Sequence, residues 1–195
     1  SSMRSSLFTI IVFSFLLISC KESSTNSDSD LPDGLVWSDE FDGTNLNRNN
    51  WYPEQGDHGW GNNELQNYTN DDDNIVVSDG TLKIIARKID EGQERGNCTS
   101  ARLTSIPTFG PGHRMEIRAK MPELKGNGLW PAIWMLGDGI RNGVSWPECG
   151  EIDIMELIRG ANRDNTTHGT AHWSGANGYA SYGGSKKLSS GIFAD

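Results

Sequence analysis

The chain has 195 residues, 35% of them hydrophobic and 22% charged, which is enough for one globular domain with short additions. Its formal net charge of −9 argues against nucleic acid and anionic membrane surfaces as partners, because like charges repel. Its 23 glycines and few long apolar helical patterns favour an all-β domain, and its 7 tryptophans indicate flat binding surfaces.

Residues 1–20 have the pattern of a lipoprotein signal peptide. Arg4 gives a positive start, and the apolar run Leu7–Ile18 is too short to cross about 30 Å of hydrocarbon. The segment Leu17–Cys20 resembles a bacterial lipobox, in which the cysteine is lipidated after cleavage; the alternative is an ordinary signal peptide with an incidental cysteine. We expect an exported lipoprotein at the outer membrane or cell surface, in contact with membrane only through lipid on Cys20.

Residues 21–33 are rich in Ser, Asp and Asn and predict a flexible polar tether. From Gly34 the pattern changes to short strands and turns, so residues 34–195 are expected to form the globular part. The acidic turn Asp39–Gly43 is compatible either with ordinary turn chemistry or with a share of a calcium site, because hard cations bind carboxylate and backbone oxygens.

Strand patterns follow along the chain. Residues 74–77 and 81–87 flank Ser78–Gly80 and predict a β-hairpin. Alternation of apolar and polar residues predicts further strands over 101–106 and 115–121, and no long amphipathic helix is expected.

Three aromatic-rich segments precede the acidic strand, and the third, Trp146–Gly150, runs directly into Glu151. Trp60 lies among Asn62, Glu64 and other amides in a Gly-flexed loop, which suits either a polar surface or a sugar-binding site. Trp130 and Trp134 share a strand face by parity, and they are either core residues or binding platforms.

The segment Glu151–Glu156 holds three carboxylates, at Glu151, Asp153 and Glu156. On a helix they would point about 0°, 200° and 140° around the axis and share no face. On a regular strand Glu151 and Asp153 share one face, and Glu156 would point into the apolar layer, which is costly for an unpaired carboxylate. One extra residue at Met155, a β-bulge, would place all three acids on one face. The alternative is a strained core strand or a solvated acidic face.

Beyond this segment, His168, Thr170 and His172 share one strand face. Two histidines four residues apart on a strand lie about 13 Å apart, too far to bind one metal ion. We therefore expect no catalytic transition metal. Ser/His/Asp hydrolysis is also not supported, since the chain lacks a Gly-x-Ser-x-Gly elbow.

Four segments, which follow one another along the chain in the family's order, resemble glycoside hydrolase family 16 in its laminarinase-like branch. The most specific is the Glu-x-Asp-x-x-Glu signature at Glu151–Glu156 with its Trp146-Pro147 lead-in; the others are Trp60–Gln66, Leu129–Ala132 and His168–Trp173. The resemblance runs from about Gly34 to the last residue. It implies a concanavalin A-like jelly-roll sandwich of two curved antiparallel sheets, whose concave sheet forms a cleft for a polysaccharide.

The resemblance also implies a retaining endo-β-1,3-glucanase that works by double displacement. Glu151 would be the nucleophile, Asp153 its supporting neighbour and Glu156 the general acid/base. The same machinery on mixed-linkage β-glucan or a marine galactan, and a non-catalytic glycan-binding lipoprotein, remain alternatives. We expect a monomer whose partner is a β-glucan.

Further roles follow only from the resemblance. Substrate-binding residues would be Trp130, Trp134, Trp146, His172, Asn62, Glu64 and Arg102. No cofactor is implied for catalysis, and Glu40 with the backbone at Gly80 would be part of a structural calcium site. The family's last strands are expected to lie beyond Asp195, and pairing of Cys98 with Cys149 is left open.

Overall fold

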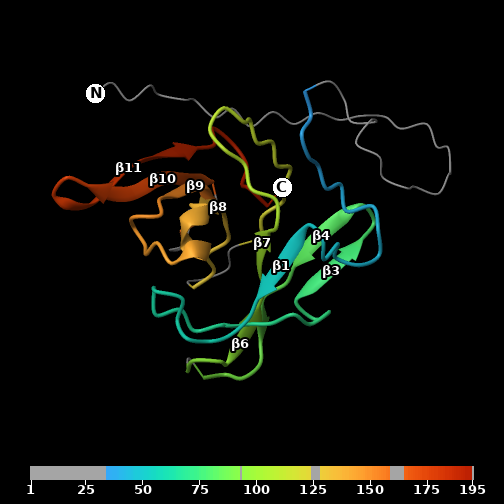
Figure 1. Ribbon diagram of the computed structural model, residues 1–195. Coiled ribbons are helices and arrows are strands. Elements are labelled where there is room, and N and C mark those ends of the chain that lie inside the picture. Colours follow the sequence, from blue (N-terminus) through green and yellow to red (C-terminus); the bar gives the residue numbers. More distant parts are fainter. Residues whose placement is uncertain (1–33, 93, 124–127, 159–164, 195) are drawn as a thin grey trace. The chain divides into compact units, whose positions relative to one another are not determined.

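The computed structural model describes residues 34–92, 94–123, 128–158 and 165–194. The predicted signal peptide, the tether and the lipidation site Cys20 lie outside these ranges. Within them, regular structure consists of strands and one short 3-10 helix, so the predicted all-β class is confirmed (Figure 1). No helix in these ranges is long and apolar enough to cross a membrane.

The described residues group into two compact units, 34–111 and 112–194. The first unit contains β1 Trp51–Glu54, β2 Asn67–Tyr68, β3 Ile75–Ser78, β4 Thr81–Ile84, β5 Arg87–Lys88, β6 Cys98–Ser100 and β7 Arg102–Ser105. These strands pair as β1-β7, β2-β6-β5 and β3-β4, and only β2-β6 is parallel.

The predicted hairpin is present as β3 and β4. Ser78 pairs with Thr81, and the two turn residues between them, Asp79 and Gly80, have φ of 56° and 67°. Positive φ at both central positions is typical of the turn whose twist matches antiparallel strands. The strand predicted over 101–106 is also found, as β7.

An apolar core and a buried polar side chain hold this unit together. Its core consists of Leu46, Ile75, Val77 and Ala101, and the alternation of β3 supplies two of these four residues. Beside that core, Asn74 is only 1% exposed.

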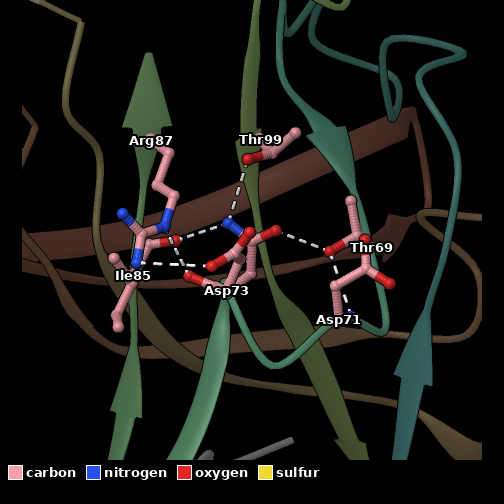
Figure 2. A network of polar contacts seen from close by, with 7 residues as sticks. Thr69, Asp71, Asp73, Ile85, Arg87 and Thr99 are labelled. Carbon is pink, nitrogen blue, oxygen red and sulfur yellow. Dashed lines mark hydrogen bonds and ion pairs between the residues drawn. The ribbon is translucent and has the colours of Figure 1, made fainter. Parts of the chain in front are cut away.

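A buried amide connects three segments of this unit. Asn74 Nδ2 donates to Ile85 O at 2.8 Å and to Thr99 Oγ1 at 3.0 Å, and Thr69 Oγ1 donates to Asn74 Oδ1 at 2.6 Å. Figure 2 shows this network, with Arg87 next to it on the backbone carbonyl of Asp73. A buried amide whose donors and acceptor are satisfied orders the chain around it.

The second unit is built on one four-stranded antiparallel sheet. Its elements are β8 Ala132–Leu136, the 3-10 helix η1 Asp138–Asn142, β9 Glu151–Glu156, β10 Thr166–Gly175 and β11 Gly178–Lys187. The strand order is β11-β10-β9-β8, and Figure 1 shows the long β10–β11 hairpin in orange and red. The hairpin turns at residues 176 and 177, after the pair Gly175 and Gly178.

A small apolar cluster lies beneath this sheet. Met155 and Leu157 are buried, and Met121, Leu129, Ile133 and Phe193 pack against them.

The strand predicted over residues 115–121 is wrong. Met115 and Ile117 are half-buried between exposed neighbours, as alternation indicated, yet the segment forms no strand. Met121 N donates to Phe193 O at 3.0 Å. Alternation indicates which side chains are covered. A strand also needs a second strand with which its backbone can form hydrogen bonds, and the local pattern does not encode that partner.

Candidate active site

A β-bulge interrupts β9 among its acidic residues. Against β8, Ile133 pairs with Met155 and the next residue, Trp134, pairs with Asp153, so Ile154 has no counterpart. The bulge predicted from parity is therefore present. The residue without a partner is Ile154 and not Met155, because Met155 pairs with Ile133 and its side chain is buried in the apolar cluster.

The bulge places the three acids on one face of the sheet. Glu151, Asp153 and Glu156 stand opposite Leu136, Trp134 and Ala132, which alternate on β8. On the other side they stand opposite His172, Thr170 and His168 of β10. Residues two apart on a strand share a face, so each acid points the same way.

Two of the acids have raised pKa values. Asp153 is 6% and Glu156 is 8% exposed. The pKa of Glu151 is raised first by burial and then by the negative charge of Asp153. Burial and the charge of Glu156 raise the pKa of Asp153, and a hydrogen bond from His172 acts in the opposite direction. Burial disfavours an ionised carboxyl, and neighbouring carboxylates add to that penalty.

Tryptophan side chains donate to both glutamates. Trp130 Nε1 donates to Glu156 Oε1 at 2.9 Å, and Trp146 Nε1 donates to Glu151 Oε2 at 2.8 Å. Trp130 is 44% and Trp146 is 48% exposed, so neither ring is a core residue. Trp134 is half-buried on β8, opposite Asp153 on the same face. Exposed rings beside paired carboxylates offer an apolar surface to a ligand at the acids.

His172 connects Asp153 to the edge of the sheet. Its Nε2 lies 2.9 Å from Asp153 Oδ2, and its Nδ1 lies 2.7 Å from the hydroxyl of Tyr179 on β11. The ring of Trp146 lies 5.4 Å from that of Tyr179 and 6.1 Å from that of His172, centroid to centroid.

Tyr179 was missed by the sequence reasoning. Its signal is the segment Gly175–Gly178, whose Asn and Gly residues favour a hairpin turn and in which Gly178 has φ of 101°. The turn sets the register of β10 and β11, in which Tyr179 lies diagonal to His172 on the same face.

Glu151, Asp153 and His172 also have the composition of a metal-binding group. Within the described residues, their ligand atoms lie within 4.8 Å of one another. Both ring nitrogens of His172 already lie within hydrogen-bond distance of protein groups, Asp153 and Tyr179. His168, on the same face, stands opposite Glu156 and does not belong to this group.

The sugar-binding loop predicted around Trp60 forms its own cluster in the unit 34–111. Glu64 accepts from Asn62 Nδ2 at 3.1 Å and from the hydroxyl of Tyr68 at 3.2 Å, and Gln66 Nε2 also donates to it. Burial first, and then the charge of Glu64, raise the pKa of Tyr68 to about 12. The cluster presents an acid and two amides close together, which is the kind of group that binds sugar hydroxyls.

Arg102 belongs to this same cluster. It stands opposite Glu54 in the β1–β7 pair and forms an ion pair with it. Its guanidinium lies 4.7 Å from the ring centroid of Trp60, a cation–π arrangement. Arg102 therefore contacts both Glu54 and the Trp60 ring.

The predicted calcium position is only partly matched by its surroundings. A Cβ added at Gly80 would lie 3.7 Å from Asp42 Oδ1, so the neighbouring carboxylate belongs to Asp42 and not to Glu40. Among described residues, no group of three acid, histidine or cysteine ligands includes Glu40. A structural calcium ion at this position, which would take six to eight oxygen ligands, stays a prediction. Cys98 and Cys149, whose pairing was left open, are both free cysteines.

Comparison with known proteins decides the family. A model described as an XgeA-like, catalytic GH16 domain matches residues 54–188, which includes the three acids, the Trp146 segment and the β10–β11 hairpin. The chain belongs to glycoside hydrolase family 16. The family that the sequence motifs predicted is thereby confirmed.

Relatives of this GH16 chain include glucanases. It is 44% identical over 178 residues to a β-glucanase of Rhodothermus marinus, covering 87% of this chain and 58% of the relative. It is 43% identical over 146 residues to a glucan endo-1,3-β-glucosidase of Cryptopygus antarcticus, covering 73% of this chain and 52% of that protein. The chain therefore spans little more than half the length of these relatives.

The fold is shared with a solved GH16 structure. LamA from Z. galactanivorans, in complex with laminaritriose and laminaritetraose, superposes with a TM-score of 0.64 at 36% identity, covering 79% of this chain and 67% of that one. The predicted jelly-roll class of this GH16 chain is thereby confirmed.

Proposed function

We propose that this GH16 chain is the catalytic part of a retaining endo-β-1,3-glucanase that hydrolyses laminarin-type glucan. One observation carries the proposal: the bulge at Ile154 brings Glu151, Asp153 and Glu156 to one face of β9. Retaining hydrolysis needs two carboxyl groups close together that flank the scissile bond, one to attack and one to exchange a proton. The glucanase relatives support β-1,3-glucan as the substrate.

In the first step, Glu151 attacks the anomeric carbon and the bond to the leaving oxygen breaks while Glu156 donates its proton to that oxygen. The glycosyl group is then covalently bound to Glu151. In the second step, Glu156 takes a proton from a water molecule, whose oxygen attacks the same carbon and releases Glu151. Glu151 must be ionised to attack: the hydrogen bond from Trp146 lowers its pKa and supports that form, against burial and the charge of Asp153, which raise it.

The proposed sugar-binding residues fall into two sets. In the sheet unit, the rings of Trp130, Trp134 and Trp146 would stack on pyranose faces beside the acids, with His172 next to them. In the unit 34–111, Asn62, Glu64 and Arg102 would bind hydroxyls, supported by their hydrogen bonds and by the stacked Trp60 ring.

Reducing-sugar release from laminarin, lichenan and agarose tests the substrate. We expect release from laminarin by the full chain. Release from lichenan alone would favour mixed-linkage glucan, release from agarose alone a galactan, and binding without release a glycan-binding protein. Any of these three outcomes overturns the β-1,3-glucanase proposal.

Substitution of the two glutamates separates their roles. Glu151→Ala and Glu156→Ala are each expected to abolish turnover while laminarin binding is largely kept. With an aryl β-glucoside that carries a good leaving group, azide should restore activity in both variants. The product would be an α-glycosyl azide with Glu151→Ala and a β-glycosyl azide with Glu156→Ala, because only the second still forms the covalent intermediate. The opposite pair of products would exchange the two assignments.

Export and lipidation are proposed from residues 1–20 alone. Radiolabelled palmitate should enter the full chain in a bacterial host and should not enter Cys20→Ser, whereas Cys149→Ser, as the matched control, should keep the label.

Light scattering of the chain lacking residues 1–20 should give the mass of a monomer. Melting curves with and without calcium should test the position at Glu40 and Gly80.

A further inference from the structure

Tyr179 is joined to the acid cluster by a continuous set of polar contacts. It stands opposite Ser174 on β10 and diagonal to His172, so its ring reaches the imidazole. The two rings stack, with centroids 5.9 Å apart and an interplanar angle of 20°. Its hydroxyl lies 2.7 Å from His172 Nδ1, and His172 Nε2 lies 2.9 Å from Asp153 Oδ2.

We propose that Tyr179 is a positioning residue whose hydroxyl holds His172 in the tautomer that donates a hydrogen bond to Asp153. The proposal deepens the proposed glucanase function, because it assigns how the acid between the two catalytic glutamates keeps its charge. Tyr179 itself acts through His172 and takes no part in bond making or breaking.

A neutral imidazole has one N–H donor and one bare nitrogen, and a carboxylate can only accept. When the hydroxyl of Tyr179 donates to Nδ1, the proton of the ring must be on Nε2, where it points at Asp153 Oδ2. The other tautomer would turn a lone pair of Nε2 towards the ionised carboxylate. Because a phenol hydroxyl can donate or accept whereas a carboxylate can only accept, an ionised Asp153 requires the proton on Nε2, and donation from Tyr179 to the bare Nδ1 stabilises that tautomer.

Asp153 needs such a donor because its surroundings oppose ionisation. It is 6% exposed, and its pKa is raised by burial and by the charge of Glu156. The hydrogen bond from His172 acts against both effects. The ionised Asp153 in turn raises the pKa of Glu151. Through the hydrogen bonds Tyr179–His172 and His172–Asp153, Tyr179 thus influences the pKa values of Asp153 and Glu151.

By register Glu151 stands directly opposite His172, whereas the hydroxyl of Tyr179, on the neighbouring strand, lies at hydrogen-bond distance from Nδ1. Lys187 of β11 pairs with Thr166, six residues from His172, and Ala132–Leu136 of β8 contain no ionisable residue. The ionisable groups of this face, apart from His172 and Tyr179, are Glu151, Asp153 and Glu156 on β9, His168 on β10 and Lys187 on β11, with the exposed Glu148 in the loop after η1.

The ring of Tyr179 has a competing explanation. It is 54% exposed and lies 5.4 Å from the Trp146 ring at 32°, so it could be a platform for a sugar ring. A platform would act on substrate affinity through the ring, whereas a positioning residue acts on turnover and its pH dependence through the hydroxyl. Replacing the hydroxyl alone separates the two.

Two variants of the full chain form the kinetic test: Tyr179→Phe and the matched control Tyr182→Phe, whose side chain is 78% exposed on the other face of the same strand. On laminarin, we expect Tyr179→Phe to lower kcat about tenfold with KM within about twofold. Its acidic limb of kcat/KM should move to higher pH, because a lost donor raises the pKa of Asp153. Tyr182→Phe should match the wild type. Unchanged kcat and pH profile in Tyr179→Phe, or a change in KM alone, would overturn the proposal.

A spectroscopic readout keeps the test independent of activity. The ring nitrogen shifts of His172, assigned with a His172→Asn variant, distinguish an N–H from a bare nitrogen. We expect a bare Nδ1 and a protonated Nε2 in the wild type, and a mixture of tautomers in Tyr179→Phe. Identical His172 spectra in the two proteins would refute the positioning role. Absence of sugar release by the wild type would instead refute the glucanase proposal, and the spectra would still decide the role of Tyr179.

Discussion

Asp153 and Glu156 are three residues apart on one strand, yet they lie on the same face of β9. Their partners on β8, Trp134 and Ala132, are two residues apart, because Ile154 between the acids has no counterpart. The extra residue turns Glu156 out of the apolar layer and leaves Met155 in it. A single bulge thus decides both the core and the acid cluster of this sheet.

Deleting Ile154 should therefore abolish the proposed activity. A regular strand would send Glu156 to the apolar face, and loss of a proton-transferring group lowers the rate on the order of a thousandfold. The measurement is laminarin hydrolysis, with near-ultraviolet circular dichroism to report whether the sheet forms. Ile154→Val, which keeps the residue count, is the control and should remain active. A folded and active deletion variant would show that the bulge is not required.

Glu151→Gln should raise stability at neutral pH although it removes the proposed nucleophile. The folded-state pKa of Glu151 is raised, so its protonated form favours folding below the ordinary value of 4.5, and this contribution is lost as pH rises through the folded-state pKa. A neutral amide avoids that loss. We expect Tm about 2 °C above the wild type at pH 7, with the difference shrinking towards pH 4. The exposed Glu148→Gln should show no such trend, and a lower Tm for Glu151→Gln at pH 7 would contradict the sign.

Removing one partner of the Arg102–Glu54 pair should lower the free energy of unfolding, whereas replacing both partners by apolar residues should change it little. Their side chains are 20% and 27% exposed, and Arg102 also covers the Trp60 ring. Arg102→Ala should lower the free energy of unfolding by about 2 kcal/mol, since it leaves Glu54 largely buried without its ion-pair partner. The double variant Glu54→Leu with Arg102→Met should come within about 1 kcal/mol of the wild type. Urea denaturation measures both; equal losses in the single and double variants would argue against the pair as the cause.

Asn74 should dominate the polar stability of the unit 34–111. Its amide makes three side-chain hydrogen bonds and is 1% exposed, so Asn74→Ala leaves Thr69, Ile85 and Thr99 with unmet polar groups. We expect a loss of about 3 kcal/mol by urea denaturation. The exposed Asn49→Ala is the matched control and should change stability by less than about 0.5 kcal/mol. A loss below about 1 kcal/mol for Asn74→Ala would show that water satisfies the same groups.

Local pattern was sufficient for several parts of the structure. The β3–β4 hairpin follows from a polar turn between alternating segments, and the need for a bulge follows from the wrong parity of Glu156. Both are properties of neighbouring residues, so the sequence contains them directly. Alternation at Met115 and Ile117 was likewise correct about which residues are covered, but it wrongly predicted a strand.

By itself, then, the sequence determined the all-β class, the acid triplet and the parity conflict that requires a bulge, because these depend on contacts between near neighbours along the chain. Only the tertiary structure decided which residue is unpaired, which indole reaches Glu156 and which phenol reaches His172. The Trp130–Glu156 bond joins residues 26 positions apart, and Asp153 and His172 are 19 apart. Such contacts depend on which strands lie side by side and in what register, and that is settled by packing of the whole sheet.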